Sequence, residues 1–201
     1  IVTDGAGNVW VTGYTISLSF PVSIGAFQGS LNGMKDGFVA KFNSSGNLQW
    51  ATYYGGSNDD NPYDIASDAL GNVVITGPTS STDFPFSTGA FQTTKGAVSE
   101  DAFVVKLDNT GLRVWGTYYG GDSQDWSSAI ITNTANEIII TGATVSANFP
   151  VSPTAYQGTR NGSMDVFIVK LDAAGNSIWA TYYGGSSGDL GNGIVVDKST
   201  N

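Results

Sequence analysis

Apolar residues in this sequence follow short runs and two-residue alternations, which are typical of β-strands. The stretch 101–108 (DAFVVKLD) is rich in β-branched and aromatic residues, and the stretch 113–119 (RVWGTYY) lies near an alternation of two. Two shorter apolar runs precede them, at 65–68 (IASD) and 72–77 (NVVITG). Because no stretch carries an apolar stripe with a period of 3.6 residues, we predict four strands here and no helix.

Turn residues separate these expected strands. A short turn containing Asn and Gly lies at 68–72, and the turn at 108–111 ends in Gly111. This glycine, like Gly46 and Gly175 elsewhere in the chain, suits a type I turn closed by a left-handed bulge residue. A connection of about 23 residues, 78–100, joins the second strand to the third. The four strands are therefore expected to form one antiparallel meander.

The same pattern occurs three times along the chain. The motif YYGG stands at 53–56, 118–121 and 182–185, at spacings of 65 and 64 residues. Other motifs recur at matching spacings: Trp50, Trp115 and Trp179; Phe20-Pro21, Phe84-Pro85 and Phe149-Pro150; AFQ at 26–28, AFQ at 90–92 and AYQ at 155–157. The chain thus contains three copies, at about 1–57, 65–121 and 130–185, and residues 194–201 repeat the start of a copy.

Four antiparallel strands in a repeat of about 64 residues are typical of a β-propeller blade. Such a small sheet buries its two faces by stacking on neighbouring blades around an axis, and the recurrent aromatic residues supply rings to fill the space between blades. We therefore predict an all-β fold. Residues 1–201 would form one partial propeller domain of three four-stranded blades, with the first strand of a fourth blade at 194–201.

These motifs together resemble SBBP, a bacterial seven-bladed β-propeller repeat family. The motifs concerned are GG-x-x-D-D, I-x-x-D-x-x-G-N-x-x-x-T-G, F-P-x-x-x-x-A-F-Q and D-x-F-V-x-K-L, and the resemblance covers the chain three times over. The third copy departs from the pattern, with Asn133 in place of the first-turn Asp and Asn136-Glu137 in place of Gly-Asn. The resemblance implies a propeller in a large secreted or surface-attached bacterial protein, and it supplies no catalytic residues.

By analogy with related propellers, we expect 65–68 to be an innermost strand and 113–119 an outermost one. The short turns at 43–47 and 68–72 would then lie on one face, and the long loop 78–100 and the loop 57–64 on the other. Closed propellers use about four to eight blades, so three blades do not close. We expect either a piece of a longer chain or two copies joined into a six-bladed ring.

Composition excludes several classes of function. The 201 residues include no His and no Cys, which excludes Ser-His-Asp and Cys-His catalysis, zinc or haem held by those ligands, and disulfides. The net charge is −9, and the eight Lys and Arg residues are scattered rather than clustered. We therefore expect no nucleic-acid partner, and the short apolar runs predict no membrane insertion.

Asp60, Asp125 and Asp189 occupy the same place in the three copies, four residues after the second Gly of the Gly-Gly pair. Oxygen ligands on a glycine-rich loop are of the kind that calcium prefers. The candidate calcium ligands are Asp59, Asp60, Asp64, Asp122 and Asp125. The alternative is that each Asp accepts hydrogen bonds from loop amides, and we favour it because the spacing is not that of an EF-hand.

Other repeated charges indicate structural roles. Asp36, Asp101 and Asp165 begin the third strand, and Lys41, Lys106 and Lys170 follow five residues later. A Lys stem in this position would lie over an aromatic ring while its ammonium pairs with an Asp. Asp4, Asp68, Asn133 and Asp197 are expected to cap the first turn.

Catalysis within these residues is not expected. The chain has two Glu residues, Glu100 and Glu137, and neither recurs in the other copies. A sialidase-like site would need three Arg residues on its substrate, whereas this chain has Arg113 and Arg160. The three copies are also nearly identical, whereas an enzyme site combines unlike residues at a single place.

The second halves of the long connections, 30–35, 93–100 and 158–164, vary among the copies and are polar and glycine-rich. Variable loops on a fixed scaffold are where recognition tends to occur. Trp126 is a further outlier, since its counterparts are Asn61 and Leu190. We expect it either to stack on a sugar or anchor a protein partner, or to pack under its own loop.

The sequence therefore predicts a non-catalytic propeller scaffold of a secreted or cell-surface bacterial protein, with loops that bind a protein or a glycan. Trp126, Asp125, Asp60 and Asp189 are the candidate ligand-binding residues. No cofactor is expected apart from the candidate calcium. Two alternatives remain open: part of a propeller-type polysaccharide hydrolase or lyase, and a structural spacer of a large surface protein.

Overall fold

The computed structural model describes residues 1–97 and 100–197, and the regular elements in these residues are all β-strands. The strands form three antiparallel sheets of four strands each, which we call blades 1, 2 and 3. Blade 1 contains β1 (Val2–Thr3), β2 (Val9–Thr15), β3 (Asp36–Phe42) and β4 (Leu48–Tyr54). Blade 2 contains β5 (Asp64–Ser67), β6 (Val73–Thr79), β7 (Asp101–Leu107) and β8 (Arg113–Tyr119). Blade 3 contains β9 (Asp125–Thr132), β10 (Ile138–Thr144), β11 (Asp165–Leu171) and β12 (Ser177–Tyr183).

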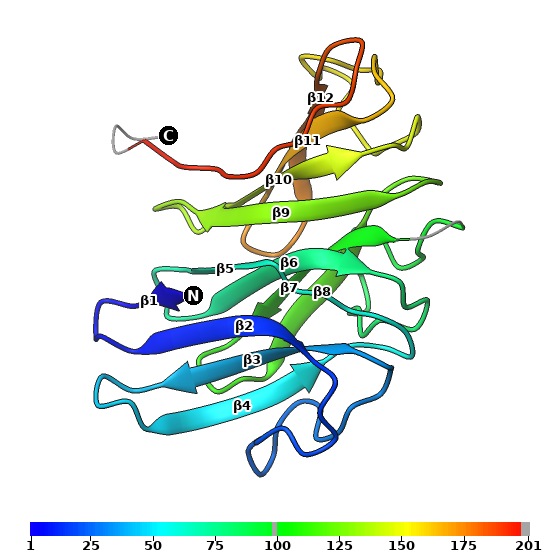
Figure 1. Cartoon of the computed structure of the whole chain (residues 1–201). Helices are drawn as coiled ribbons and strands as arrows, with labels where there is room; N and C mark the ends of the chain where they lie inside the picture. The colour runs from blue at the N-terminus through cyan, green and yellow to red at the C-terminus, as the bar shows by residue number, and fades with distance from the viewer. Residues whose placement is uncertain (98–99, 198–201) are drawn as a thin grey trace.

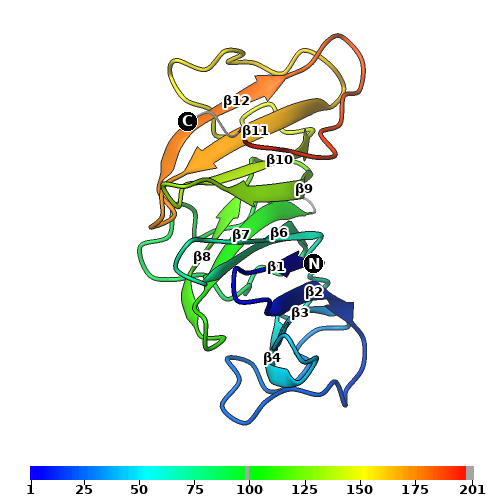
Figure 2. The same cartoon turned by 90° about the vertical axis from the view of Figure 1, so that its left-hand side faces the viewer.

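Each strand pairs with the next strand along the chain, so each blade is a meander. The blades stack on one another in chain order, from the blue and cyan strands of blade 1 to the yellow and orange strands of blade 3 (Figures 1 and 2). The predicted all-β fold with three four-stranded blades is thus confirmed.

The strand expected at 194–201 is not confirmed. Residues 189–197 contain no strand, and 198–201 lie outside the described residues. The physical reason is the pairing rule of the blade, in which the first strand bonds only to the second, as β5 does to β6. Residues 194–197 have no such second strand beside them in the described part of the chain, so their backbone groups lack a ladder to join.

The hydrophobic core lies between the blades. One cluster joins Trp50 and Tyr54 of blade 1 to Ile75, Phe84 and other buried residues of blade 2. A second cluster joins Trp115 of blade 2 to residues of blade 3 in the same way. Because each sheet buries apolar side chains against its neighbour, the two junctions hold the blades together.

Left-handed glycines close the turns where the sequence predicts them. Gly46, Gly111 and Gly175 have φ of 78°, 89° and 88°. The register between the third and fourth strands shifts just beside each of these turns, for example between Lys106 and Leu107. In the first turn of blade 3, Asn136 takes the left-handed conformation that Gly71 adopts in blade 2, with φ of 59°. Asn tolerates this conformation better than most residues with a side chain.

The two ends of the stack carry different loops. Short turns of neighbouring blades meet at one end, where Ala69 N donates to Asn136 Oδ1 at 3.0 Å. Long loops and Gly-Gly loops meet at the other end, where Ser57 N donates to Asp83 Oδ1 at 2.8 Å. The first strands of blades 2 and 3 also touch, through a bond from Thr132 Oγ1 to Ser67 O. The short turns and the long loops therefore lie at opposite ends of the stack, as the sequence predicts.

Candidate binding face

We call the end of the stack that carries the long loops 16–35, 80–97 and 145–164 the loop face. A glutamine anchors the first half of each loop to its own blade. Gln28 Nε2 donates to Asp36 Oδ2 at 2.6 Å, while Gly55 N donates to Gln28 Oε1 at 2.9 Å. Gln92 and Gln157 make the same two contacts in the other blades. Sequence reasoning did not assign a role to these glutamines, although their recurrence in the A-F-Q motif was the available signal.

A tyrosine from the fourth strand fixes the start of each loop. Tyr118 Oη donates to Ser81 O at 2.9 Å and accepts a bond from Phe84 N at 3.1 Å. Tyr53 and Tyr182 hold the loops of blades 1 and 3 in the same way. The first tyrosine of each YYGG motif thus acts within its own blade.

The aspartate at the start of each third strand holds the variable half of the loop. Asp36 is fully buried, and its carboxylate accepts bonds from Asn32 N at 2.8 Å and Gly33 N at 3.0 Å. Asp165 does the same with Asn161 and Gly162, at 3.0 and 2.9 Å. The oxygens of these aspartates are thus directed to loop amides.

Lys106 and Lys170 pair with the first turn of their own blade. Lys106 Nζ lies 2.8 Å from Asp68 Oδ2, with both side chains almost completely buried. Lys170 Nζ lies 2.6 Å from Glu137 Oε2 at a more exposed position. Burial favours the neutral form of Asp68, but Lys106 and the bonds from Asn72 outweigh it and lower the pKa of Asp68. In blade 3, Asn133 stands in the place of Asp68, and Glu137 stands in the place of Asn72. Glu137 thus supplies the negative charge that pairs with the lysine of this blade.

Asp60 and Asp125 join neighbouring blades. Asp60 Oδ2 accepts bonds from Gly56 N at 2.7 Å and from Ser81 Oγ at 2.9 Å, and the Thr79 hydroxyl donates to Oδ1. Asp125 Oδ2 accepts equivalent bonds from the amide of Gly121 and the hydroxyl of Ser146, both at 2.7 Å. Both carboxyl groups are completely buried. Their geometry is that of acceptors for loop amides and hydroxyls.

The first Gly of each Gly-Gly pair lies between two buried carboxyl groups. A Cβ on Gly55 would lie 2.7 Å from Asp60 Oδ2 and 3.0 Å from Asp36 Oδ1. Gly120 lies in the same way between Asp101 and Asp125, with the corresponding oxygens both 2.8 Å away. Only glycine fits this close approach, which accounts for its recurrence at this place in the motif.

This crowding favours the protonated form of some of these acids. Burial raises the pKa of Asp60 to about 7, and the nearby Asp36 adds to the rise while bonds from Thr79 and Gly56 oppose it. Burial also raises the pKa of Asp101 to about 6, with Asp125 adding to the effect. Burial raises the pKa of Asp125 as well.

The candidate calcium ligands do not converge. Asp59 Oδ2 lies 3.1 Å from Lys35 Nζ, and Asp64 Oδ2 accepts a bond from Ile130 N at 2.9 Å. Asp122 is exposed, whereas Asp60 and Asp125 are buried at two different junctions. Across residues 1–97 and 100–197, no three acidic side chains are grouped so that they could hold a metal ion.

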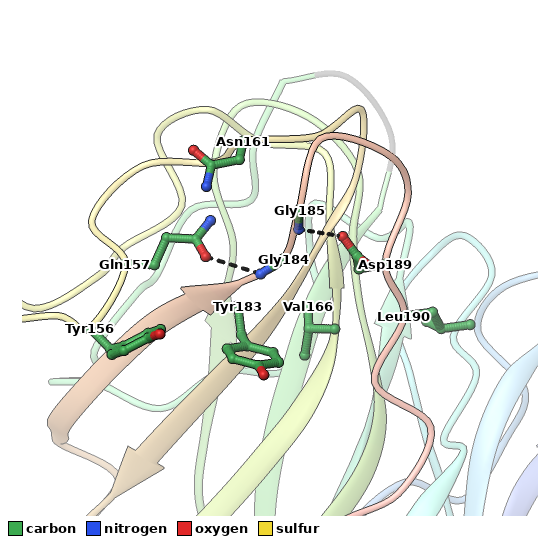
Figure 3. A pocket seen from close by; sticks show the side chains of 9 residues that line it. All are labelled: Tyr156, Gln157, Asn161, Val166, Tyr183, Gly184, Gly185, Asp189 and Leu190. Carbon is green, nitrogen blue, oxygen red and sulfur yellow. Dashed lines mark hydrogen bonds between the residues drawn. The ribbon is translucent and has the colours of Figure 1, made fainter.

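Asp189 borders a cavity of about 770 Å³ on blade 3 (Figure 3). Its Oδ2 accepts a bond from Gly185 N at 2.8 Å, as Asp60 does from Gly56. Tyr156 and Tyr183 also line the cavity. The equivalent positions in blades 1 and 2 are covered by the next blade, so this cavity lies where blade 3 is uncovered, beside its long loop.

Trp126 lies in β9 rather than in the loop before it. It is half-buried near the loop end of the strand, and it pairs with Ala143 of β10. Its counterpart Asn61 is buried, whereas Leu190 is exposed. Trp126 and Asp125 are adjacent at the start of β9, but Asp60 and Asp189 belong to other junctions. The structure therefore distributes the four candidate residues over three separate places and does not bring them into one site.

The two arginines are also engaged by their own blades. Arg113 Nη1 donates to Pro85 O and Phe86 O at 2.9 and 2.8 Å, and its guanidinium lies over Phe27 of blade 1. Arg160 Nη1 donates to Gly162 O at 2.7 Å. Both side chains shape the long loops.

Comparison with known protein families identifies the repeat. Residues 49–85 match the SBBP family, which is described as a beta-propeller repeat. This segment is therefore similar to a repeat of the SBBP family. The matched SBBP segment includes most of β4 and all of β5 and β6, so it spans the junction between blades 1 and 2.

The whole chain is also similar to an uncharacterized WD repeat-containing protein, L264, of Acanthamoeba polyphaga mimivirus. The identity is 24% over an alignment of 254 residues, and the chain spans 18% of the length of that protein. Together with the SBBP match, this similarity supports a propeller scaffold. The part of the chain that the structure describes has no helix with the length and apolar character that a membrane crossing requires.

Proposed function

We propose that this chain is a non-catalytic β-propeller scaffold of a secreted or cell-surface bacterial protein, and that its loop face binds a protein or a glycan. The observation that carries the proposal is the division of each long loop. The first half is anchored by the same glutamine and tyrosine contacts in all three blades. The second half differs in sequence from blade to blade and exposes side chains such as Met34 and Asn161.

Such a division favours recognition. The buried aspartates Asp36 and Asp165 bind backbone amides of the variable halves, so these segments are ordered before a partner arrives. Preorganised loops lose less conformational entropy on binding. Different side chains on equally held loops then give each blade its own contact surface.

Trp126 is the aromatic side chain that we expect to contribute most to binding. It lies near the loop end of an innermost strand, and it is neither fully buried nor fully exposed. A partly exposed indole supplies a large rigid surface for a sugar ring or an apolar side chain at a small entropic cost.

Binding of the labelled chain to a glycan array tests the proposal. We expect selective binding that Trp126→Ala weakens on the order of thirtyfold, because loss of a dominant aromatic contact costs about 2 kcal/mol. Trp126→Phe is the matched control and should retain most of the affinity. Equal thermal melting of the variants would show that the loss is local. Unchanged binding of Trp126→Ala would remove Trp126 from the site.

Reducing-sugar release from a panel of polysaccharides separates a binding scaffold from an enzyme. We expect no release above the blank with the chain alone. Release that scales with protein concentration would contradict the non-catalytic proposal.

A further inference from the structure

In the junction between blades 1 and 2, an arginine of blade 2 lies against an aromatic ring of blade 1. The Arg113 guanidinium is over Phe27, 5.1 Å from the ring centroid. Its Nη1 donates to Pro85 O at 2.9 Å and to Phe86 O at 2.8 Å. One ring and two carbonyls thus form a receptor for a guanidinium group, whose N–H donors bind the carbonyls while its charge faces the ring.

The junction between blades 2 and 3 has an equivalent ring. Phe91 stands in the place of Phe27 in the A-F-Q motif. Its ring stacks on Tyr119 with 4.8 Å between centroids, just as Phe27 stacks on Tyr54 with 5.1 Å. Phe91 is nevertheless 42% exposed, whereas Phe27 is half-buried. Part of the Phe91 ring is therefore accessible to a ligand.

The same junction also has equivalent carbonyls, those of Pro150 and Val151. Pro150 O accepts a bond from Tyr119 Oη at 2.9 Å, and across residues 1–97 and 100–197 no side chain donates to Val151 O. Ser177 stands in the place of Arg113, and its hydroxyl lies 3.2 Å from Tyr119 Oη. Because serine is short and uncharged, this junction keeps the receptor for a guanidinium group but does not supply the guanidinium.

A groove adjoins the Phe91 ring. It has a volume of about 490 Å³ and lies along the edge strand β8, between the long loop of blade 2 and the turn 173–175 of blade 3. Phe91 and Trp115 are among its lining residues. The equivalent space between blades 1 and 2 is about 30 Å³, and two of its lining side chains, Ile24 and Thr110, are larger than their counterparts. The groove thus gives the main chain of a partner room beside the ring.

We propose that this groove binds an arginine side chain of a partner protein, in the way that Arg113 is bound between blades 1 and 2. The guanidinium lies over Phe91 and donates to Pro150 O and Val151 O. Arginine suits the receptor better than lysine, because its planar group stacks on a ring while it donates in fixed directions. The net charge of −9 also favours the approach of a cationic partner.

This site goes beyond the proposed function, which concerns the variable second halves of the long loops. Its loop residues, 87–91, belong to the first half of the loop, which Gln92 and Tyr118 anchor to blade 2. The two sites can therefore be tested separately.

The test titrates the isotopically labelled chain with the peptide acetyl-Gly-Gly-Arg-Gly-Gly-amide and follows the backbone amide signals by NMR. We expect shifts at the amides of Phe91 and Val151 and a dissociation constant on the order of 1 mM. The same peptide with citrulline in place of arginine keeps the shape and loses the charge. It should bind at least about tenfold more weakly. Absence of these shifts up to about 20 mM of the arginine peptide, or equal binding of both peptides, would overturn the proposal.

One variant supplies the guanidinium from the chain itself. Ser177→Arg should occupy the receptor and abolish binding of the arginine peptide. Leu48→Arg is the matched control, because Leu48 is the exposed counterpart of Ser177 in blade 1 and the added charge is the same. It should leave the affinity unchanged. Peptide binding that persists in a folded Ser177→Arg would place the peptide elsewhere and would contradict the proposal.

A second variant removes the ring, so the test does not depend on the folding of Ser177→Arg. Phe91→Leu keeps an apolar side chain and should weaken peptide binding about fivefold, because the cation loses the aromatic face. Phe27→Leu makes the same change where Arg113 already covers the ring, and it should not alter the affinity for the peptide. Equal affinity of the wild type and Phe91→Leu would exclude Phe91 from the site.

Discussion

At the scale of single residues, the most informative feature is the pair of carboxyl groups beside each Gly-Gly pair. Asp60 and Asp101 have pKa values raised by burial, to about 7 and about 6. A buried acid with a raised pKa binds its proton more tightly in the folded state than in the unfolded state. Its contribution to stability is complete below the unfolded pKa of about 3.9 and is lost as the pH rises through the native value.

We therefore expect the free energy of unfolding to fall as the pH rises from about 5 to about 8. The variant Asp60→Asn, which imitates the protonated acid, should flatten this decline. Denaturant titrations at a series of pH values measure both effects. A rise in stability through this interval, or an unchanged pH dependence in Asp60→Asn, would contradict the raised pKa of Asp60.

The second Gly of the Gly-Gly pair permits a matched comparison between a covered junction and the uncovered face of blade 3. A Cβ on Gly121 would lie 2.6 Å from Ser146 Cβ, whereas nothing lies within 4 Å of that position at Gly185. We expect Gly121→Ala to destabilise the chain by about 1–3 kcal/mol through overpacking. Gly185→Ala should change stability by less than about 0.5 kcal/mol. Equal effects in urea denaturation would contradict the difference between the junctions.

The recurrence of Asp60 behind a Gly-Gly pair was enough to predict that it bonds to loop amides. The sequence did not predict that Asp36 would lie beside it, because the two residues are 24 positions apart and only the packing of the loop against the strand brings them together. The sequence singled out Trp126 because its counterparts in the other copies are Asn61 and Leu190. Its half-buried position was not predictable, because it depends on the residue at which β9 begins.

At the scale of elements, the repeated turns and strands follow from local sequence, whereas the partners of charged residues do not. Strands such as β7 and β8 were predictable from their apolar composition, and Gly111 from the geometry of the turn. The partner of Lys106 is Asp68, which lies 38 positions earlier and is brought close by the pairing of β6 with β7. Cross-strand contacts of this kind depend on register, which a two-residue pattern does not fix by itself.

The buried pair of Lys106 and Asp68 should matter more for stability than the partly buried pair of Lys170 and Glu137. Removal of one partner from a buried pair leaves an uncompensated charge, so we expect Lys106→Met to cost about 3–5 kcal/mol. Lys170→Met should cost at most about 1 kcal/mol, because water solvates the remaining carboxylate. Urea denaturation of the two variants checks this order, and a larger loss for Lys170→Met would contradict it.

Calcium should not change the stability of the chain. The predicted ligands are distributed between two junctions and an ion pair with Lys35, so no loop offers a set of converging oxygens. We expect the same melting temperature with calcium and with a chelator, since a ligand that binds the native state must raise it. A rise with calcium would show that the carboxylates rearrange around the ion.

At the scale of the whole molecule, the hydrophobic core lies between the blades. Both hydrophobic clusters combine residues of two neighbouring blades, and the bonds of Trp50, Trp115, Asp60 and Asp125 all cross a junction. The sequence predicted this stacking because each copy repeats the same aromatic residues on a sheet that is too small to bury them alone. The number of blades and the closure of the ring were not predictable. The repeated motifs indicate which residues meet between two blades, but they do not give the rotation angle between blades that decides the size of a ring.

Hydrogen exchange of the monomeric chain at low concentration tests this account most directly. Gly56 N and Gly121 N donate to buried carboxyl groups where two blades meet, whereas Gly185 N donates to Asp189 on the uncovered face of blade 3. We predict slow exchange of peptides that cover 55–62 and 120–127 and fast exchange of a peptide that covers 184–191. Equal exchange in all three copies would contradict the claim that the junctions between blades hold the protein together.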